Sequence, residues 1–251
     1  NGYIQDLRIY NGVAKYTEDF IPASTNPDIT LDTPSGVVYP SITDSSNMGS
    51  VSSNGSSNYL SLAANSDLDF GTGNFTIEGY FYKNKTSGNQ ALVASQKYYN
   101  ASGPNGNWVL RITDDTRMAF ASYDGTSNSE YSEFTTTNNL SNWHHFALVR
   151  EGTGSNQTKL YYDGKLAGSM TVSKSLSDGG DNGIFIADDG SGPNSPLNGC
   201  ISNVRIIKGT ALYTSDFAPP TEALTAVTNT KLLCCQSTES VTAAEVTPGT
   251  I

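Results

Sequence analysis

Apolar and polar residues alternate along most of the chain between residues 59 and 207. In the segment NFTIEGYFY, Ile77 and Phe81 share one face, whereas Glu78 and Tyr80 share the other. The same alternation recurs in NWVLRIT, RMAFASY, NWHHFALVR, NGIFIAD and GCISNVRII, and clusters of Gly, Asn, Asp and Ser separate these segments. A period of two residues is typical of strands that bury one face. The pattern therefore predicts many short strands and no long helix.

Two Asp-Gly pairs, at residues 124–125 and 163–164, lie between predicted strands. Because Asp-Gly tolerates the positive φ angles of a tight turn, each pair predicts a β-hairpin. The best candidate for helix is a single turn capped by Thr214 and ended by the prolines at 219–220. Short antiparallel strands at this spacing predict an all-β fold, a two-sheet antiparallel jelly-roll sandwich.

A segment of 24 residues, which we call the repeated segment, occurs twice, at Asn1–Ser24 and at Asn198–Thr221. Aligned without gaps at an offset of 197, the two copies are identical at 12 of 24 positions. Arg8 and Arg205 occupy one such position, inside a predicted strand, where we expect the stem to pack on the sheet and the guanidinium to be paired. We expect Tyr213 and Phe217 to pack the end of the second copy of the segment back onto the domain.

The repeat suggests the order of the domains. We predict that residues 1–24 are the C-terminal closing segment of a preceding repeat and that the proline-containing residues 25–40 are a linker. Residues 41–221 then form the jelly-roll domain. Residues 222–251, which contain the strand-like TKLLCCQ, are predicted to be a linker or the start of a following module.

The charge and composition of the chain argue against two classes of binding partner, nucleic acid and the membrane interior. The net charge is −10, and 36% of the residues are hydrophobic while 15% are charged. A chain of this charge is repelled by phosphate, so we expect no binding to nucleic acid. The sequence has no run of about 18 apolar residues, so we expect no insertion into a membrane.

The three cysteines, Cys200, Cys234 and Cys235, are too few for a disulfide framework. Adjacent cysteines in an extended strand point to opposite faces, so a bridge between Cys234 and Cys235 would be strained. We expect all three to be reduced, buried and small hydrophobic residues.

Four segments taken together resemble a laminin G-like domain of the concanavalin A-like lectin/glucanase superfamily. They are NYLSLAANSDLDFGTGNFTIEGYFY, NWHHFALVREG, LYYDGKLAGS and GCISNVRIIKGTALYTSDFAPPT. The resemblance covers residues 41–221, with residues 1–24 as a partial preceding copy, and it implies a two-sheet jelly roll. The phrases GVAKYTEDF and TNTKLLCCQS are further similar to the tail and virion structural proteins of marine bacteriophages.

This resemblance implies a non-enzymatic structural and adhesion module on the surface or tail of a phage virion. Its partners would be other virion subunits or copies of itself, and host-surface glycans. The alternative is a secreted or cell-surface carbohydrate-binding adhesin repeat of a cellular organism. A retaining glucanase needs two carboxylates about 5 Å apart on one face. Glu78 stands alone in its strand, and Glu130 and Glu133 lack the Asp found between the carboxylates in hydrolase members, so we expect no enzymatic activity.

Some relatives hold calcium at the rim of the sandwich, and this is the one cofactor that the resemblance suggests. Calcium takes six to eight oxygen ligands. The candidate ligands are Asp178, Asp181, Asp188 and Asp189, which lie in two loops joined by one strand. Asp67 and Asp69 are a second candidate pair. The alternative is that these residues only form turns, which Asp favours.

Sugar binding is the common use of this family, and it requires aromatic rings beside polar groups. Tyr98, Tyr99 and Tyr131 lie in or beside predicted loops. Exposed rings of this kind can stack on a pyranose. They are the predicted ligand-binding residues, although the same rings could cover the edge of the core or contact a neighbouring subunit.

Overall fold

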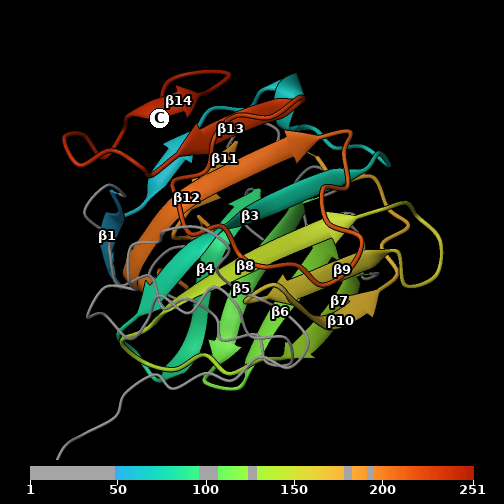
Figure 1. The fold of residues 1–251 in the computed structure, drawn as a ribbon, viewed down its shortest axis with the longest axis horizontal. Coiled ribbons are helices and arrows are strands. Elements are labelled where there is room, and N and C mark those ends of the chain that lie inside the picture. The colour runs from blue at the N-terminus through green and yellow to red at the C-terminus, as the bar shows by residue number, and fades with distance from the viewer. Residues whose placement is uncertain (1–48, 96–106, 124–128, 178–182, 191–194) are drawn as a thin grey trace, which may run out of the picture. The chain divides into compact units, whose positions relative to one another are not determined.

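The computed structural model describes residues 49–95, 107–123, 129–177, 183–190 and 195–251. All of them belong to the second of two compact units, Asp44–Ile251. Within these residues the strands form two antiparallel sheets that pack face to face (Figure 1). The predicted all-β sandwich is confirmed. The predicted hairpin at residues 124–125 lies outside the described residues.

The first sheet has eight strands in the described part of the chain. Along its main path these are β10 (Lys165–Met170), β9 (Thr158–Tyr162), β8 (Trp143–Arg150), β3 (Phe75–Lys83), β12 (Asn198–Lys208), β13 (Thr230–Cys234) and β14 (Ala244–Val246), while β1 (Val51–Asn54) also pairs with β12. In the β9–β10 hairpin, Asp163 and Gly164 have φ angles of 47° and 74°. Both are positive, as the predicted Asp-Gly turn requires.

The second sheet has six strands among the described residues. In order these are β2 (Leu60–Leu62), β11 (Ile184–Ile186), β4 (Ser87–Ser95), β5 (Asn107–Asp114), β6 (Arg117–Tyr123) and β7 (Ser129–Thr135). The only helical segment in this part of the chain is one short 3-10 turn, Ser66–Leu68. The helical turn predicted near Thr214 does not form, because this segment runs over the first sheet as irregular chain.

The core lies between the two sheets and follows the predicted alternation. On β3, Ile77 and Phe81 are buried in it, and on β5 Trp108 and Leu110 meet them from the opposite sheet. The indole nitrogen of Trp108 donates a hydrogen bond to the carbonyl oxygen of Ser177, at 3.1 Å. Such a bond satisfies the one polar atom of a fully buried tryptophan.

The structure extends the jelly-roll domain beyond residue 221, its predicted C-terminal boundary. Residues 222–251 were expected to be a linker or to begin another module, but β13 and β14 extend the first sheet instead. β13 pairs with Val204–Ile207 of β12 and brings Leu232 and Cys234 into the core. An unpaired β12 would expose its backbone groups along this edge, so the added strand completes the sheet.

The cysteine prediction is also corrected. Cys235 follows the end of β13 and has a φ of +62°, so it leaves the extended conformation. Both Cys234 and Cys235 therefore point into the same core cluster, rather than to opposite faces. Cys200 is half-buried, and its register partner Tyr82 lies on the outward-facing side of β3. No helix in the described residues has the length and apolar composition needed to cross a membrane.

Candidate functional site

The outer face of the second sheet carries a cluster of small apolar side chains, which we call the floor. Ala91, Ala94, Val109 and Ala121 form a buried cluster separate from the main core. On β5 and β6 they alternate with core residues, and on β4 Ala91 and Ala94 flank the core residues Leu92 and Val93 at a β-bulge, so the four side chains point away from the core. The floor ends at β7, where Tyr131 pairs with Ala121 and its side chain is 45% exposed. Tyr131 therefore stands beside a residue too small to cover its ring.

A chain of hydrogen bonds connects Tyr131 to three charged side chains, which we call the Tyr131 cluster. The Tyr131 hydroxyl donates to Glu133 Oε1 at 2.6 Å, and Glu133 also pairs with Arg117. Arg117 Nε donates to Asp114 Oδ2 at 2.8 Å. The hydrogen bond from Arg117 lowers the pKa of Asp114 to about 2. The cluster thus presents one ring, one cation and two carboxylates in fixed positions.

Arg111 supports this cluster from β5, two strands away from Tyr131 in the sheet. Its guanidinium carbon lies 5.8 Å from the centre of the Tyr131 ring, within range of a cation–π contact. Burial, followed by the hydrogen bond to Glu133, raises the pKa of the Tyr131 hydroxyl. The hydroxyl therefore remains a hydrogen-bond donor at neutral pH.

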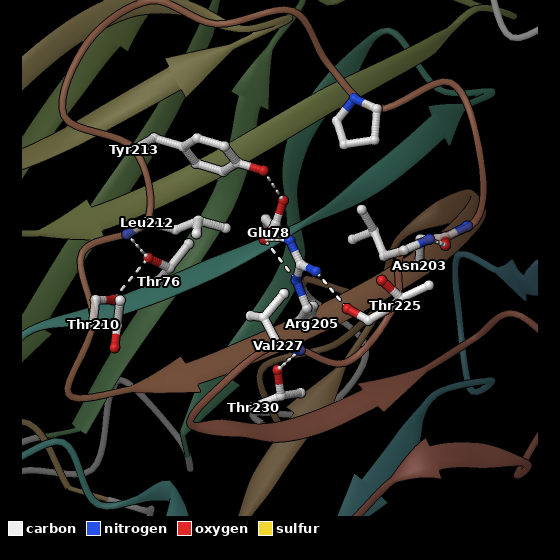
Figure 2. A network of polar contacts seen from close by, with 12 residues as sticks. Thr76, Glu78, Asn203, Arg205, Thr210, Leu212, Tyr213, Thr225, Val227 and Thr230 are labelled. Carbon is white, nitrogen blue, oxygen red and sulfur yellow. Dashed lines mark hydrogen bonds and ion pairs between the residues drawn. The ribbon is translucent and has the colours of Figure 1, made fainter.

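The outer face of the first sheet carries a different group, a buried polar network (Figure 2). Arg205 donates to Glu78 Oε1 from both Nε and Nη2, at 2.9 and 2.6 Å. The Tyr213 hydroxyl donates to Glu78 Oε2 at 2.9 Å, and His145 Nε2 lies 3.4 Å from the same oxygen. Glu78 is fully buried, and both of its carboxylate oxygens accept hydrogen bonds from within the protein.

Residues 209–224 cover this network, and we call them the strap. Arg205 Nη1 donates to the carbonyl oxygen of Thr225 just after the strap, at 2.6 Å, and the Tyr80 hydroxyl donates to that of Pro220. The Tyr213 ring stacks on Phe217 with 3.6 Å between ring centres. The expectation that Tyr213 and Phe217 fold back onto the domain agrees with these contacts, as does the pairing of Arg205. The sequence did not identify Glu78 as their partner.

The architecture can now be compared with that of known proteins. The profile of a family described as the concanavalin A-like lectin/glucanases superfamily, Laminin_G_3, matches residues 54–213. The chain belongs to this superfamily. No curated protein sequence matches the chain.

Solved structures share the superfamily fold at low sequence identity. A candidate carbohydrate-binding protein from Bacteroides ovatus has a TM-score of 0.55 and 18% identity, and the match covers 74% of this chain and 51% of that protein. A leech intramolecular trans-sialidase has a TM-score of 0.51 and 14% identity over 66% of this chain and 26% of the enzyme. The chain thus spans about half of the first protein and a quarter of the second.

Of the predicted ligand-binding residues of this superfamily member, Tyr131 is within the described part of the chain. It lies in strand β7 rather than in a loop, because the run of alternating residues reaches Ser129. Tyr98 and Tyr99 lie outside the described residues. The partners of Tyr131 were missed by the sequence, although the alternation of Tyr131 and Glu133 could have placed both on one face.

Two of the four predicted calcium ligands lie within the described residues. Asp188 and Asp189 are buried, and the backbone nitrogen of Asp189 donates to Asp188 Oδ1 at 2.6 Å. Burial raises the pKa of Asp188. Asp178 and Asp181 lie outside the described residues, and no cluster of three or more His, Cys, Asp or Glu side chains suited to a metal occurs among the residues that are described. Calcium at this rim stays a prediction.

The second candidate pair for calcium has other contacts. Asp67 Oδ1 accepts a hydrogen bond from the Lys231 ammonium at 2.9 Å. Asp69 Oδ1 accepts from the backbone nitrogen of Gly71 at 3.1 Å, as in a turn. These contacts favour the turn-forming alternative for this pair.

The carboxylates considered for glucanase chemistry are separated by the sheet. Glu130 accepts hydrogen bonds from the backbone and hydroxyl of Ser173, whereas Glu133 faces the other side of β7 and pairs with Arg117. Residues three apart in a strand point to opposite faces. Glu78 is buried under the strap on the other sheet. These three carboxylates therefore do not form a pair that could flank one glycosidic bond.

Proposed function

We propose that this member of the superfamily is a non-enzymatic module that binds glycans through the Tyr131 cluster. The observation that carries the proposal is the exposed Tyr131 ring held beside Arg117, Glu133 and Asp114. A ring can stack on the apolar face of a pyranose, while charged groups exchange hydrogen bonds with its hydroxyls. Because these groups already bond to one another, little side-chain entropy is lost on binding.

The superfamily and its structural neighbours support a carbohydrate ligand. The Bacteroides ovatus protein is named for proposed carbohydrate binding. The leech enzyme is described in complex with 2,7-anhydro-Neu5Ac. The match covers 26% of that enzyme, so we do not transfer its catalytic activity to this chain.

The test is binding of the whole chain to a glycan array, followed by calorimetry with the best ligand. Replacing Tyr131 by Ala removes the ring and should weaken binding at least tenfold, while leaving the free energy of unfolding nearly unchanged, as expected for an exposed side chain. Leu166→Ala is the matched control, because Leu166 is 49% exposed and lies on the first sheet. Equal affinity of the Tyr131→Ala and Leu166→Ala proteins would reject the Tyr131 cluster as the site.

For the wider setting, we propose a repeat unit of a phage tail or virion-surface protein that contacts other subunits, copies of itself and host glycans. The support is the repeated segment. The residues that its two copies share include those that hold the strap on the sheet. They are Arg8 and Arg205, Tyr16 and Tyr213, Phe20 and Phe217, and Asp19 and Asp216. Asp216 Oδ1 accepts a hydrogen bond from the backbone nitrogen of Leu166 at 2.9 Å.

The alternative setting is a secreted or cell-surface adhesin repeat of a cellular organism. The source genome separates the two. Capsid or tail genes beside this one, with further copies of the repeated segment in the same reading frame, are expected for the virion setting. A secretion signal and a cell-wall or outer-membrane anchor in that reading frame would replace it with the adhesin.

A further inference from the structure

Cys234 and Cys235 are adjacent in sequence and bring their sulfur atoms together. The two Sγ atoms lie 3.5 Å apart, and both side chains are buried in the core between the sheets. The backbone is the reason, because the positive φ of Cys235 turns its side chain to the side that Cys234 already faces. A cysteine in the left-handed region is uncommon, and such positions mark turns or functional constraints.

We propose that Cys234 and Cys235 are a redox-active pair that closes reversibly into an eight-membered vicinal disulfide. Closure requires the sulfurs to approach from 3.5 Å to about 2.05 Å, the length of a disulfide bond. Adjacent α-carbons are only about 3.8 Å apart, below the usual range of about 4.4–6.8 Å for a disulfide. The ring is therefore strained, and strained disulfides are the labile ones.

The reaction is an exchange with a small-molecule disulfide such as oxidised glutathione. The thiolate of one cysteine attacks the oxidant and forms a mixed disulfide while one glutathione thiolate leaves. The second cysteine loses its proton and attacks the protein sulfur, and the other glutathione leaves. The two protein thiols are oxidised, the oxidant is reduced to two thiols, and no other group changes.

Burial controls when this exchange occurs. The hydrogen bond to Cys235 and burial raise the pKa of Cys234, so the closed protein holds a protonated, unreactive thiol. Cys234 is the last residue of β13 and Cys235 follows it, and β13 pairs in turn with the short strand β14 at the end of the sheet order. Short edge strands open locally more easily than the core, so we expect reaction during folding or during such an opening.

The position of the pair connects its redox state to the strap. The backbone nitrogen of Asn203 donates to the carbonyl oxygen of Cys235 at 3.2 Å. The next residue, Gln236, donates from Nε2 to Asn203 Oδ1 at 2.7 Å and to the carbonyl oxygen of Leu224 at 2.6 Å. Closure of the ring therefore fixes the corner that fastens the end of the strap.

The experiment is refolding of the whole chain in mixtures of reduced and oxidised glutathione, followed by acid quenching, alkylation and digestion with trypsin. The C-terminal tryptic peptide, Leu232–Ile251, contains both Cys234 and Cys235 and no Lys or Arg. Cys200 falls in a separate peptide, Ser175–Arg205. Mass spectrometry of the two peptides thus distinguishes a vicinal ring from every other disulfide.

With oxidised glutathione in excess, we expect Leu232–Ile251 to be unalkylated and lighter by two hydrogen atoms in most molecules, and to return to the doubly alkylated form with reduced glutathione in excess. Cys200→Ser should change neither result, whereas Cys235→Ser should abolish the lighter form. The proposal is wrong if the refolded protein, in either wild-type or Cys200→Ser form, yields only the doubly alkylated peptide. A stable glutathione adduct on this peptide, or a bridge joining it to Ser175–Arg205, would also overturn it.

Discussion

The outer faces of the two sheets differ in what they bury and what they expose. On the first sheet, Glu78 and Arg205 are charged, lie under the strap and satisfy one another. On the second sheet, the outward-pointing side chains of β4 to β6 include a floor of small apolar residues, and the charges of the Tyr131 cluster lie at the surface. The same residue types thus attach a segment on one face and are exposed to solvent on the other.

The difference follows from the dielectric environment. A buried ion pair is costly to form, but removing one partner leaves an uncompensated charge and is strongly destabilising. An exposed ion pair is screened by water and contributes little to stability. Comparable charged contacts on the two faces should therefore respond very differently to mutation.

The largest effect is expected for Glu78→Gln, which leaves the Arg205 guanidinium buried without its counter-charge. The free energy of unfolding should fall by about 3–5 kcal/mol, measured by urea denaturation. The control is the double variant Glu78→Leu with Arg205→Met, in which no charge remains. That variant should recover most of the loss, and a single variant as stable as the wild type would contradict the role of the network.

A smaller loss is expected for Tyr213→Phe, which keeps the ring stacked on Phe217 and removes the hydrogen bond to Glu78. Hydrogen bonds to charged groups contribute about 1.5–3 kcal/mol. The matched change on the other face is Tyr131→Phe, which removes a hydrogen bond to Glu133. We expect that variant to lie within about 0.5 kcal/mol of the wild type, and equal losses for both variants would remove the contrast between the faces.

Low pH should reduce the free energy of unfolding through the buried Glu78 network of the first sheet. Burial raises the pKa of Glu78, but the nearby His145 ring and the ion pair with Arg205 outweigh burial and leave it lowered. A lowered pKa stabilises the folded state above the unfolded value of about 4.3, and this stabilisation is lost as pH falls through the folded value. Urea unfolding between pH 7 and 3 should show this loss in the wild type, and the Glu78→Gln protein should show a shallower slope.

The smallest effect on stability is expected for Arg117→Ala in the Tyr131 cluster. The loss in the free energy of unfolding should be small, because the ion pairs with Asp114 and Glu133 are exposed to solvent. The pKa of Asp114 should rise from about 2 toward its ordinary value, which NMR titration of the carboxyl carbon measures. An unchanged titration would show that Arg117 does not hold this carboxylate in solution.

Much of the fold could be predicted because a strand has a local signature. The alternation of Ile77 and Phe81 with Glu78 and Tyr80 placed each side chain on its correct face, and the Asp163-Gly164 turn set the β9–β10 hairpin. The prediction failed at residues 222–251, because TKLLC reads as a strand but nothing local identifies β12 as its partner. It failed again at Cys235, where a single backbone angle changes the face of the side chain.

The amino-acid pattern alone is enough to predict the sandwich, the faces of its strands and the repeated segment, since these depend on the period of neighbouring residues and on composition. The pairing of distant side chains becomes visible only in the folded protein. Glu78 and Arg205 are 127 positions apart, and Arg117 and Glu133 come from neighbouring strands. Partners so distant in the chain are chosen by strand order and register, which depend on the packing of the whole core and have no local pattern.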